Sequence, residues 1–178
     1  MRALAPSLFL ASIALAGPAS AAVRSADASS FIVTQSYETK ADAATAFATL
    51  VEPKRWWSPQ HSWSGDANNL SLEARAGGCW CERWKDGEAE HARVIFVAKD
   101  KQMRVAGAFG PMQAMALNAV LDVQLVPTAT GTRIDMTYTV NGSPASNLDK
   151  LAPAVDGVLA EQFGRLQSLL DNGSPSAP

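Results

Sequence analysis

Residues 151–170 read LAPAVDGVLAEQFGRLQSLL, and this stretch decides the fold. Its apolar residues recur every three or four positions, the spacing of one face of an α-helix. The stripe consists of Val155, Val158, Leu159, Phe163, Leu166, Leu169 and Leu170. Pro153 fits such a helix in the first turn, where a proline removes no hydrogen bond. Gly157 and Gly164 share a face, so we expect them to let the sheet or a ligand approach the helix closely.

The segment from Leu70 to Val140 alternates apolar and polar residues with the period of two that is typical of half-buried strands. Upstream, residues 31–37 predict a first strand, residues 41–52 a helix, and Pro53 the start of a short second helix. The expected order is therefore one strand, two helices, about six strands and the long helix. The predicted fold class is α+β, with an antiparallel sheet of about seven strands.

Such a sheet has one apolar face, and the C-terminal helix is the element available to cover it. A sheet curved round one helix leaves a cavity between them, which is a natural site for an apolar ligand. The residues expected to point inward are Leu117, Leu121, Val123, Ile134, Met136, Val155, Leu159, Phe163 and Leu166.

The composition limits the classes of function. Of the 178 residues, 47% are hydrophobic and 18% are charged, which argues against a disordered chain or a polytopic membrane protein. Fifteen Lys and Arg against seventeen Asp and Glu, with no basic run, predict no nucleic-acid partner. Two cysteines and two histidines leave little for a zinc site, and no glycine-rich phosphate loop is present. We therefore expect no metal and no cofactor.

The first residues have the pattern of a secretory signal peptide. Arg2 precedes an apolar run that ends at the small-residue cleavage pattern Ala19-Ser20-Ala21. An uncleaved anchor is the alternative, but the run is shorter than the roughly 20 residues of a spanning helix. We expect a periplasmic or secreted protein with no stable membrane anchor. The predicted segments are a signal peptide (1–21), a flexible lead (22–30), one domain (31–171) and a disordered tail (172–178).

Three stretches carry a family resemblance: FIVTQSYETKADAATAFATLVEPKRWWSP (31–59), LEARAGGCWCERW (72–84) and LAPAVDGVLAEQFGRL (151–166). In these and in its element order the chain resembles the START/Bet v 1-like superfamily (SRPBCC). Within it, the chain looks like the branch named after the activator of the Hsp90 ATPase. The resemblance implies a helix-grip fold. Members include lipid and hormone carriers and polyketide cyclases, and they share no catalytic motif. A co-chaperone role with a cytosolic ATP-driven machine does not fit an exported chain.

A predicted hairpin brings together two residues with acid–base chemistry. With Asp86-Gly87 at its tip, the pairing places Glu82 opposite His91. A carboxylate that fixes the tautomer of an imidazole forms a unit able to act as a general base. Glu82 and His91 are therefore the candidate catalytic residues. The alternative is an exposed cross-strand ion pair, and the sequence does not decide which hairpin face looks into the cavity.

Candidate ligand-binding residues come from the aromatic cluster and the helix stripe. All five tryptophans lie within residues 56–84, and large amphipathic rings at one end of a cavity can stack on an apolar ligand. Packing in the core is the alternative interpretation for Trp63 and Trp80, and it is the favoured one for Trp56, Trp57 and Trp84. The predicted contacts are Trp63, Trp80, His61, Leu159 and Phe163.

Cys79 and Cys81 point to the same side of one predicted strand. We expect either two free thiols or a strained, reducible disulfide, because residues two apart lie near the upper limit of disulfide geometry. A soft-metal site with His61 or His91 and a pair of small buried residues are the other interpretations.

Two hypotheses of function follow. The first is an exported protein that binds a hydrophobic small molecule or lipid between sheet and helix. The second is a cyclase- or dehydratase-type enzyme that uses Glu82 and His91 on a bound ligand. They differ in whether those two side chains face the cavity.

Overall fold

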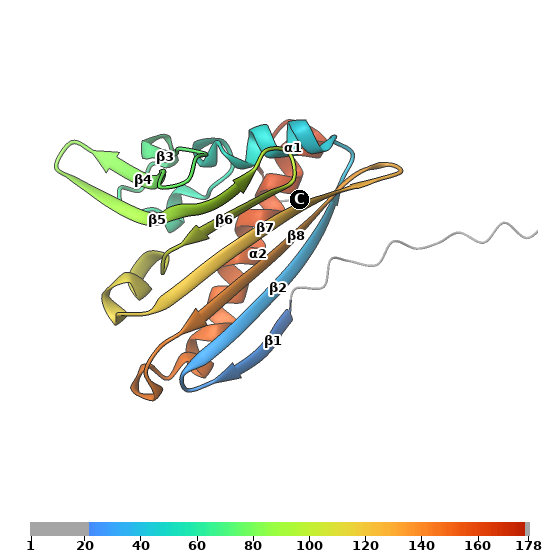
Figure 1. Ribbon diagram of the computed structural model, residues 1–178. Coiled ribbons are helices and arrows are strands. Elements are labelled where there is room, and N and C mark those ends of the chain that lie inside the picture. The colour runs from blue at the N-terminus through green and yellow to red at the C-terminus, as the bar shows by residue number, and fades with distance from the viewer. Residues whose placement is uncertain (1–21, 177–178) are drawn as a thin grey trace, which may run out of the picture.

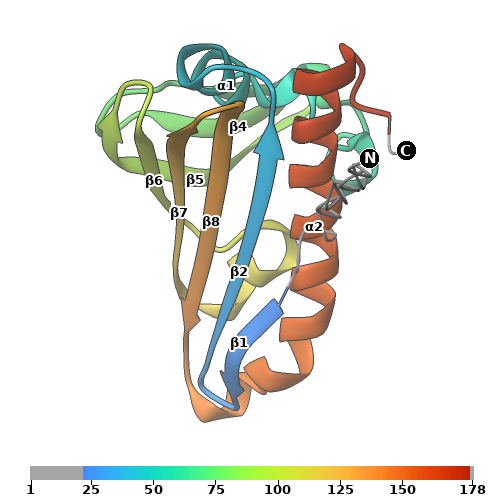
Figure 2. The same cartoon turned by 90° about the vertical axis from the view of Figure 1, so that its right-hand side faces the viewer.

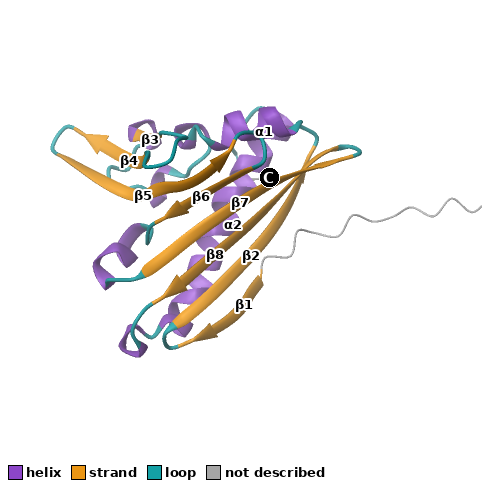
Figure 3. Ribbon diagram, in the orientation of Figure 1, coloured by secondary structure: helices purple, strands orange, loops and turns teal. Residues whose placement is uncertain are grey.

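The computed structural model describes residues 22–176, which form one antiparallel sheet and two α-helices (Figures 1 and 3). The predicted signal peptide and the last two residues lie outside this range. In spatial order the strands are β1 (Ala22–Asp27), β2 (Ser30–Thr39), β8 (Gly131–Asn141), β7 (Asn118–Thr128), β6 (Gln102–Ala106), β5 (Gly87–Ala98), β4 (Cys79–Trp84) and β3 (Leu70–Leu72). The helices are α1 (Ala43–Leu50) and α2 (Leu148–Asn172).

Helix α2 runs along one face of the sheet, as Figure 2 shows, and this arrangement confirms the prediction of a sheet covered by the C-terminal helix. Buried side chains alternate along β2 and β8, so that each strand turns its apolar face to α2. Of the residues predicted to point inward, all are buried except Leu117 and Val155, which are half-buried. Neither described helix is both long and apolar enough to cross a membrane.

The sheet has eight strands, and the additional one is β1. Residues 22–30 were expected to be a flexible lead, but Ala22–Asp27 pair with β2 along the sheet edge. The side chain of Asp27 caps the turn that follows by accepting hydrogen bonds from the backbone N–H groups of Ser29 (2.7 Å) and Ser30 (2.9 Å). That turn aligns β1 with β2, although the lead itself lacks an apolar pattern.

Both edges of the sheet are irregular or short. The pairing of β1 with β2 shifts register between Val23 and Ser25, so Arg24 sits at a bulge. At the other edge, β3 contains only the three residues Leu70–Leu72.

The predicted first helix is present, but the second is not an α-helix. Asp42 caps α1 by accepting a hydrogen bond from the backbone N–H of Thr45 (2.7 Å). Residues Pro53–Arg55 form a single 3₁₀ turn instead of a helix. Pro53 still begins the element, as expected of a proline in a first turn.

Helix α2 is longer than predicted at both ends. It starts at Leu148, so Pro153 lies inside the helix rather than in its first turn. It ends at Asn172, where Gly173 adopts a left-handed conformation (φ 74°). The Ser168 hydroxyl donates to the carbonyl of Ser176 (2.8 Å), so residues 173–176 are held against the last turn instead of forming the predicted disordered tail.

The expectation that the two glycines of α2 let the sheet approach the helix closely is wrong. A Cβ built on Gly157 or Gly164 meets no atom within 4 Å, so neither position brings the sheet close to the helix.

Candidate functional site

A pocket of about 400 Å³ opens between α2 and the sheet. Its size lies within the range of small-molecule sites, and most of its lining is apolar. The lining residues are Trp57, Gln60, His61, Ser62, Trp63, His91, Phe109, Gly110, Pro111, Met112, Tyr138, Leu151, Ala154, Val155, Val158 and Leu159. The cavity predicted between sheet and helix is therefore present.

Stacked aromatic rings form one wall of this pocket. Trp57 stacks on Phe109 with ring centroids 6.0 Å apart, and Phe109 meets the ring of Tyr138 edge-on at 5.8 Å. The Tyr138 hydroxyl donates to the carbonyl of Gly107 (3.1 Å) and accepts from the N–H of Phe109 (3.3 Å). Burial raises the pKa of Tyr138, so the phenol stays neutral. Its hydroxyl already forms hydrogen bonds with the backbone. This wall therefore offers flat apolar surface to a ligand.

Of the five predicted ligand contacts, three line the pocket. Leu159 lies on the helix side and His61 and Trp63 lie at the rim. Trp80 and Phe163 do not line it, and each packs in the core with 1% of its surface exposed. Trp80 packs behind Trp57 and Phe109 at 5.4 and 5.2 Å. Phe163 packs between Tyr37 and Trp56, farther along the helix.

Several lining residues were missed by sequence reasoning. Val155 and Val158 belong to the helix stripe, which identified the apolar face but not the part of it that borders a cavity. Trp57 was interpreted as packing, and Phe109 precedes the Gly110-Pro111 break without a signal of its own. Tyr138 continues the inward series of Ile134 and Met136 along β8, but alternation alone does not distinguish core from cavity lining.

The β4–β5 hairpin has a pairing register two residues away from the prediction. Its loop is Lys85-Asp86 rather than Asp86-Gly87, so that Gly87 pairs with Trp84 and Glu82 with Ala89. The reason is steric: a Cβ on Gly87 would lie 2.6 Å from the Trp84 ring, so a glycine fits this position.

His91 nevertheless contacts Glu82, as a diagonal rather than a directly opposite neighbour, and a β-bulge lies beside the pair. Between the pairs Cys81–Glu90 and Trp80–Ala92 the register shifts, and His91 is the extra residue. Consecutive residues of a regular strand face opposite sides, but here His91 and Ala92 are both buried. The Nε2 atom of His91 lies 2.9 Å from Oε2 of Glu82, which confirms the predicted contact by a different geometry.

Glu82 is completely buried, and its carboxylate also holds the rim of the pocket. Its two oxygens accept hydrogen bonds from the backbone N–H groups of Trp63 (2.9 Å) and Ser64 (2.5 Å). Burial raises the pKa of this carboxyl, but the hydrogen bonds from Ser64, Trp63 and His91 outweigh burial and hold the pKa below its usual value. Glu82 is therefore a carboxylate anion that contacts both the rim and His91.

His91 is the polar group that this arrangement presents to the pocket. It is 6% exposed and lines the cavity, whereas Glu82 lies behind it. Because Glu82 accepts from Nε2, the neutral ring carries its proton there and offers Nδ1 as an acceptor. Within residues 22–176, no protein group forms a hydrogen bond with Nδ1. The hairpin face that carries Trp80 and Glu82 is thus the inner one.

The rim loop is also linked to α2. Nε2 of His61 lies 3.0 Å from Oε2 of Glu161, and the Trp57 indole N–H donates to the His61 carbonyl (2.9 Å). Together with the Glu82 contacts, these bonds fix residues 57–64 at the pocket mouth.

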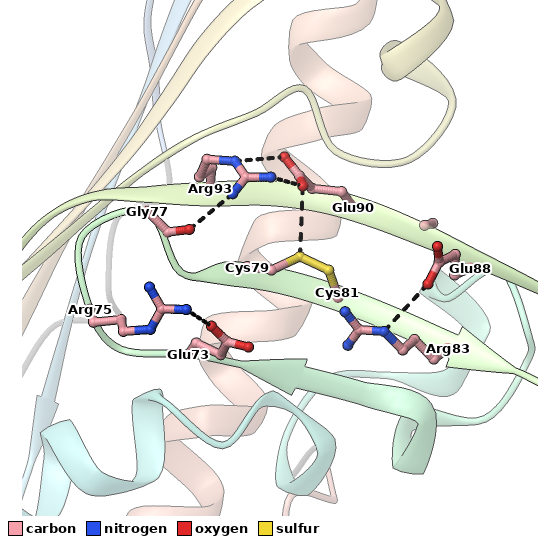
Figure 4. Close-up of a pocket in the computed structure, with 10 residues that line it drawn as sticks. Glu73, Arg75, Gly77, Cys79, Cys81, Arg83, Glu88, Glu90 and Arg93 are labelled. Carbon is pink, nitrogen blue, oxygen red and sulfur yellow. Dashed lines mark hydrogen bonds and ion pairs between the residues drawn. A yellow bond between two sulfur atoms is a disulfide. The ribbon is translucent and has the colours of Figure 1, made fainter.

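Cys79 and Cys81 form a disulfide on the opposite face of the hairpin, with a Cα–Cα distance of 5.4 Å (Figure 4). Of the two expected states, the oxidised one is present. The Oε2 atom of Glu90 lies 3.9 Å from Sγ of Cys79, so Glu90, and neither His61 nor His91, is the additional potential ligand beside the sulfurs.

The comparisons with known proteins show the fold. No family model matches the chain, and no curated protein matches its sequence. The solution structure of an Aha1 dimer from Colwellia psychrerythraea is 17% identical with a TM-score of 0.59, covering 80% of this chain and 97% of that one. A crystal structure of a Rhodobacter sphaeroides protein is 16% identical with a TM-score of 0.56, covering 85% and 97%. A conserved protein of unknown function from Enterococcus faecalis is 14% identical with a TM-score of 0.56, covering 90% and 81%. The chain thus shares its overall fold with these proteins.

Proposed function

We propose that this protein binds an apolar small molecule or lipid, with one polar group, in the pocket between α2 and the sheet. The observation that carries the proposal is the cavity of about 400 Å³ with apolar walls and one buried polar residue, His91. Trp57 and Phe109 offer stacking surface, and α2 contributes Val155, Val158 and Leu159. Apolar walls with few polar groups are the usual composition of small-molecule sites.

The polar end of the pocket, at His91, determines how the ligand is oriented. His91 is held through Nε2 by Glu82, so its other ring nitrogen is available to the pocket. A neutral imidazole in this tautomer accepts a hydrogen bond at Nδ1, which matches a ligand hydroxyl. The hydroxyl of Tyr138 is already engaged by Gly107 and Phe109. The ligand therefore places its hydroxyl at His91 and its apolar body against the aromatic wall.

We also propose that the chain is a periplasmic or secreted member of the START/Bet v 1-like superfamily, in the branch of the Hsp90 ATPase activator. The signal-peptide pattern of residues 1–21 supports export. The helix-covered sheet and the likeness of fold to the Aha1 structure support the family.

The first experiment asks what the protein carries. Native mass spectrometry of protein exported by its own source should show a bound apolar molecule that is released on unfolding. Titration with anilinonaphthalene sulfonate should then show saturable binding, with quenching of tryptophan fluorescence because Trp57 and Trp63 line the pocket.

A matched pair of variants tests the location of binding. Ala154 and Ala145 are both exposed, but only Ala154 lines the pocket. Ala154→Trp should fill the cavity and weaken dye binding by about tenfold or more, whereas Ala145→Trp should bind like the wild type. Equal binding by both variants, or a wild-type protein that neither carries a molecule nor binds the dye, would contradict the proposal.

The second candidate function is catalysis by the same pair. The observation that favours it is a buried carboxylate 2.9 Å from an imidazole that lines the cavity. In a cyclase or dehydratase, Nδ1 of His91 would take a proton from the bound ligand, and Glu82 would stabilise the imidazolium that forms.

The variant His91→Gln distinguishes the two functions, because it leaves the hydrogen bonds of Glu82 to Trp63 and Ser64 in place. A catalyst would lose turnover of the ligand identified above while retaining its binding. If the wild-type protein returns that ligand chemically unchanged after prolonged incubation, the catalytic function is wrong and the binding function stands.

A further inference from the structure

The Cys79–Cys81 disulfide lies in a groove on the outer face of the β4–β5 hairpin, away from the pocket under α2. Trp80, between the two cysteines, points to the inner face, and Figure 4 shows the disulfide on the side of β4 that faces away from α2. The groove has a volume of about 480 Å³. It is lined by Glu73, Arg75, Gly77, Cys79, Cys81, Arg83, Glu88, Ala89, Glu90 and Arg93.

Because of its position, this disulfide contributes little to the stability of the fold. A disulfide stabilises a protein mainly by closing a loop in the unfolded chain, and its effect grows with loop length. This bond joins residues two apart, which closes a very short loop. Strand β4 is also held by hydrogen-bonded neighbours on both sides, β3 and β5. The reactivity of the disulfide, rather than its effect as a cross-link, is therefore the property that needs an explanation.

The two sulfurs are unequal in access. Cys79 is half-buried in the groove, whereas Cys81 is 7% exposed. Exchange requires an incoming thiolate to reach one sulfur in line with the bond, so the accessible sulfur is attacked and the buried one leaves. The geometry therefore assigns Cys79 as the attacked residue and Cys81 as the leaving group.

Charged side chains of both signs surround the bond. Three ion pairs line the groove, Arg75–Glu73, Arg83–Glu88 and Arg93–Glu90. Oε2 of Glu90 lies 3.9 Å from Sγ of Cys79, and its ion pair with Arg93 offsets the repulsion between this carboxylate and an incoming thiolate. Mixed charges also complement the carboxylate and ammonium groups of a peptide thiol, and a groove of this size holds a short peptide.

We propose that Cys79–Cys81 is a thiol–disulfide exchange site that reacts with a peptide thiol. The thiolate of the peptide attacks Sγ of Cys79, the Cys79–Cys81 bond breaks, and its electron pair leaves on Sγ of Cys81, which then takes a proton from water. A second peptide thiolate attacks the peptide sulfur of the mixed disulfide and releases Cys79 as a thiolate, which also takes a proton from water. Two thiols are thereby oxidised to one disulfide, and the protein gains two electrons and two protons.

The test uses the full mature protein and glutathione as the probe, with a chelator present to exclude metal binding. The protein is equilibrated in buffers of reduced and oxidised glutathione, and its free thiols are counted by alkylation and mass spectrometry. The expected result is a reversible two-electron transition with unchanged far-UV circular dichroism. A bond that resists glutathione until the protein unfolds would overturn the proposal.

Two single variants test the assigned roles independently of ligand binding. In Cys81→Ser the accessible Cys79 thiol should form a mixed disulfide with oxidised glutathione, seen as the mass of one glutathionyl group. In Cys79→Ser the buried Cys81 thiol should react at least about tenfold more slowly. Equal rates would show that the groove does not select Cys79. If either variant fails to fold, the rate at which the wild-type protein forms the Cys79 adduct, located by peptide mapping, decides the same point.

Discussion

Glu82 is a negative charge in the interior that is stabilised by peptide groups and one imidazole. Among the described residues, its side-chain partner is the imidazole of His91, and its other contacts are the N–H groups of Trp63 and Ser64. An unpaired buried charge is costly, so removal of these donors would drive the carboxyl towards its neutral form. One side chain thus sets the position of the pocket rim and the orientation of the residue that faces the ligand.

The lowered pKa of Glu82 predicts a pH dependence of stability. A carboxyl whose pKa is depressed by folding stabilises the protein above its unfolded pKa of about 4.3, and this stabilisation is lost as pH falls through the folded value. Glu82→Gln lacks the charge and leaves one backbone N–H without an acceptor, which costs about 1–3 kcal/mol at neutral pH.

Urea unfolding of both proteins between pH 3 and 7 measures this difference. The gap between wild type and Glu82→Gln should be constant near neutrality and should narrow as the solution becomes acidic. Exposed carboxylates titrate alike in both proteins and cancel. A gap that stays constant to the lowest pH at which both proteins fold would show that Glu82 does not titrate in this way.

A variant of Trp63 can test ligand binding without affecting the stability of the fold. It is 50% exposed at the pocket rim, and its interaction with Glu82 comes from its backbone. Trp63→Ala should therefore change the free energy of unfolding by no more than about 0.5 kcal/mol while weakening the binding of anilinonaphthalene sulfonate. Chemical unfolding and dye titration of the same preparation check both effects, and unchanged dye affinity would place Trp63 outside the site.

At the scale of elements, the β4–β5 hairpin shows what the sequence reveals and what it hides. The Asp-Gly signal located the turn, but the Trp84 ring moved Gly87 out of the loop and into a pair. Because the pairing shifted by two residues, His91 stayed on the inner face and contacts Glu82 diagonally instead of directly, while the bulge turned Ala92 inward as well. A single extra residue leaves no mark on an alternating pattern, so the contact was predicted while its geometry was not.

The glycines of α2 provide a prediction for this element. Glycine in a helix costs about 1 kcal/mol relative to alanine, and a Cβ at Gly157 meets no atom within 4 Å. Gly157→Ala should therefore raise stability by up to about 1 kcal/mol. The position does not line the pocket, so dye binding should be unchanged.

Gly131 is the matched contrast, because there the backbone requires glycine. Its φ is 151°, and a Cβ would lie 2.0 Å from the carbonyl oxygen of Thr39. Gly131→Ala should destabilise the protein by more than the gain at Gly157. Thermal unfolding of the two variants gives the sign of each change in stability, and a stabilised Gly131→Ala would contradict the steric argument.

At the scale of the molecule, the sheet and α2 share one core, which is closely packed in one part and borders the pocket in another. Leu166 is fully buried in the packed part, whereas Leu159 borders the cavity. The periodicity of 151–170 and the alternation of the strands were enough to predict this layering. They could not locate the pocket, because helix and strand patterns state which face is apolar and not where the facing layers separate. The β1 strand was missed for a related reason, since its exposed residues carry no apolar signal.

Two leucine truncations test the core and the cavity together. Removal of a buried leucine side chain costs about 2–5 kcal/mol, and the cost rises with the empty space that it leaves. Leu166→Ala should lie at the upper part of this range, and Leu159→Ala at the lower part because its site already borders a cavity. Leu159→Ala should also alter dye affinity, while Leu166→Ala should not. Denaturant unfolding and dye titration of both variants give the comparison, and a loss below about 1 kcal/mol at either site would mean that the stripe faces solvent.

The irregular edges of the sheet bear on how the protein behaves at high concentration. A flat, exposed edge strand is a template on which another chain can add its own strand. Here one edge is bent by the bulge at Arg24, which adds a cation, and the other ends in the three residues of β3. Strand-by-strand growth into fibrils is therefore disfavoured at both ends of the sheet. Substitution of Arg24 by a strand-forming residue would remove the cation from this edge and favour aggregation without changing the pocket.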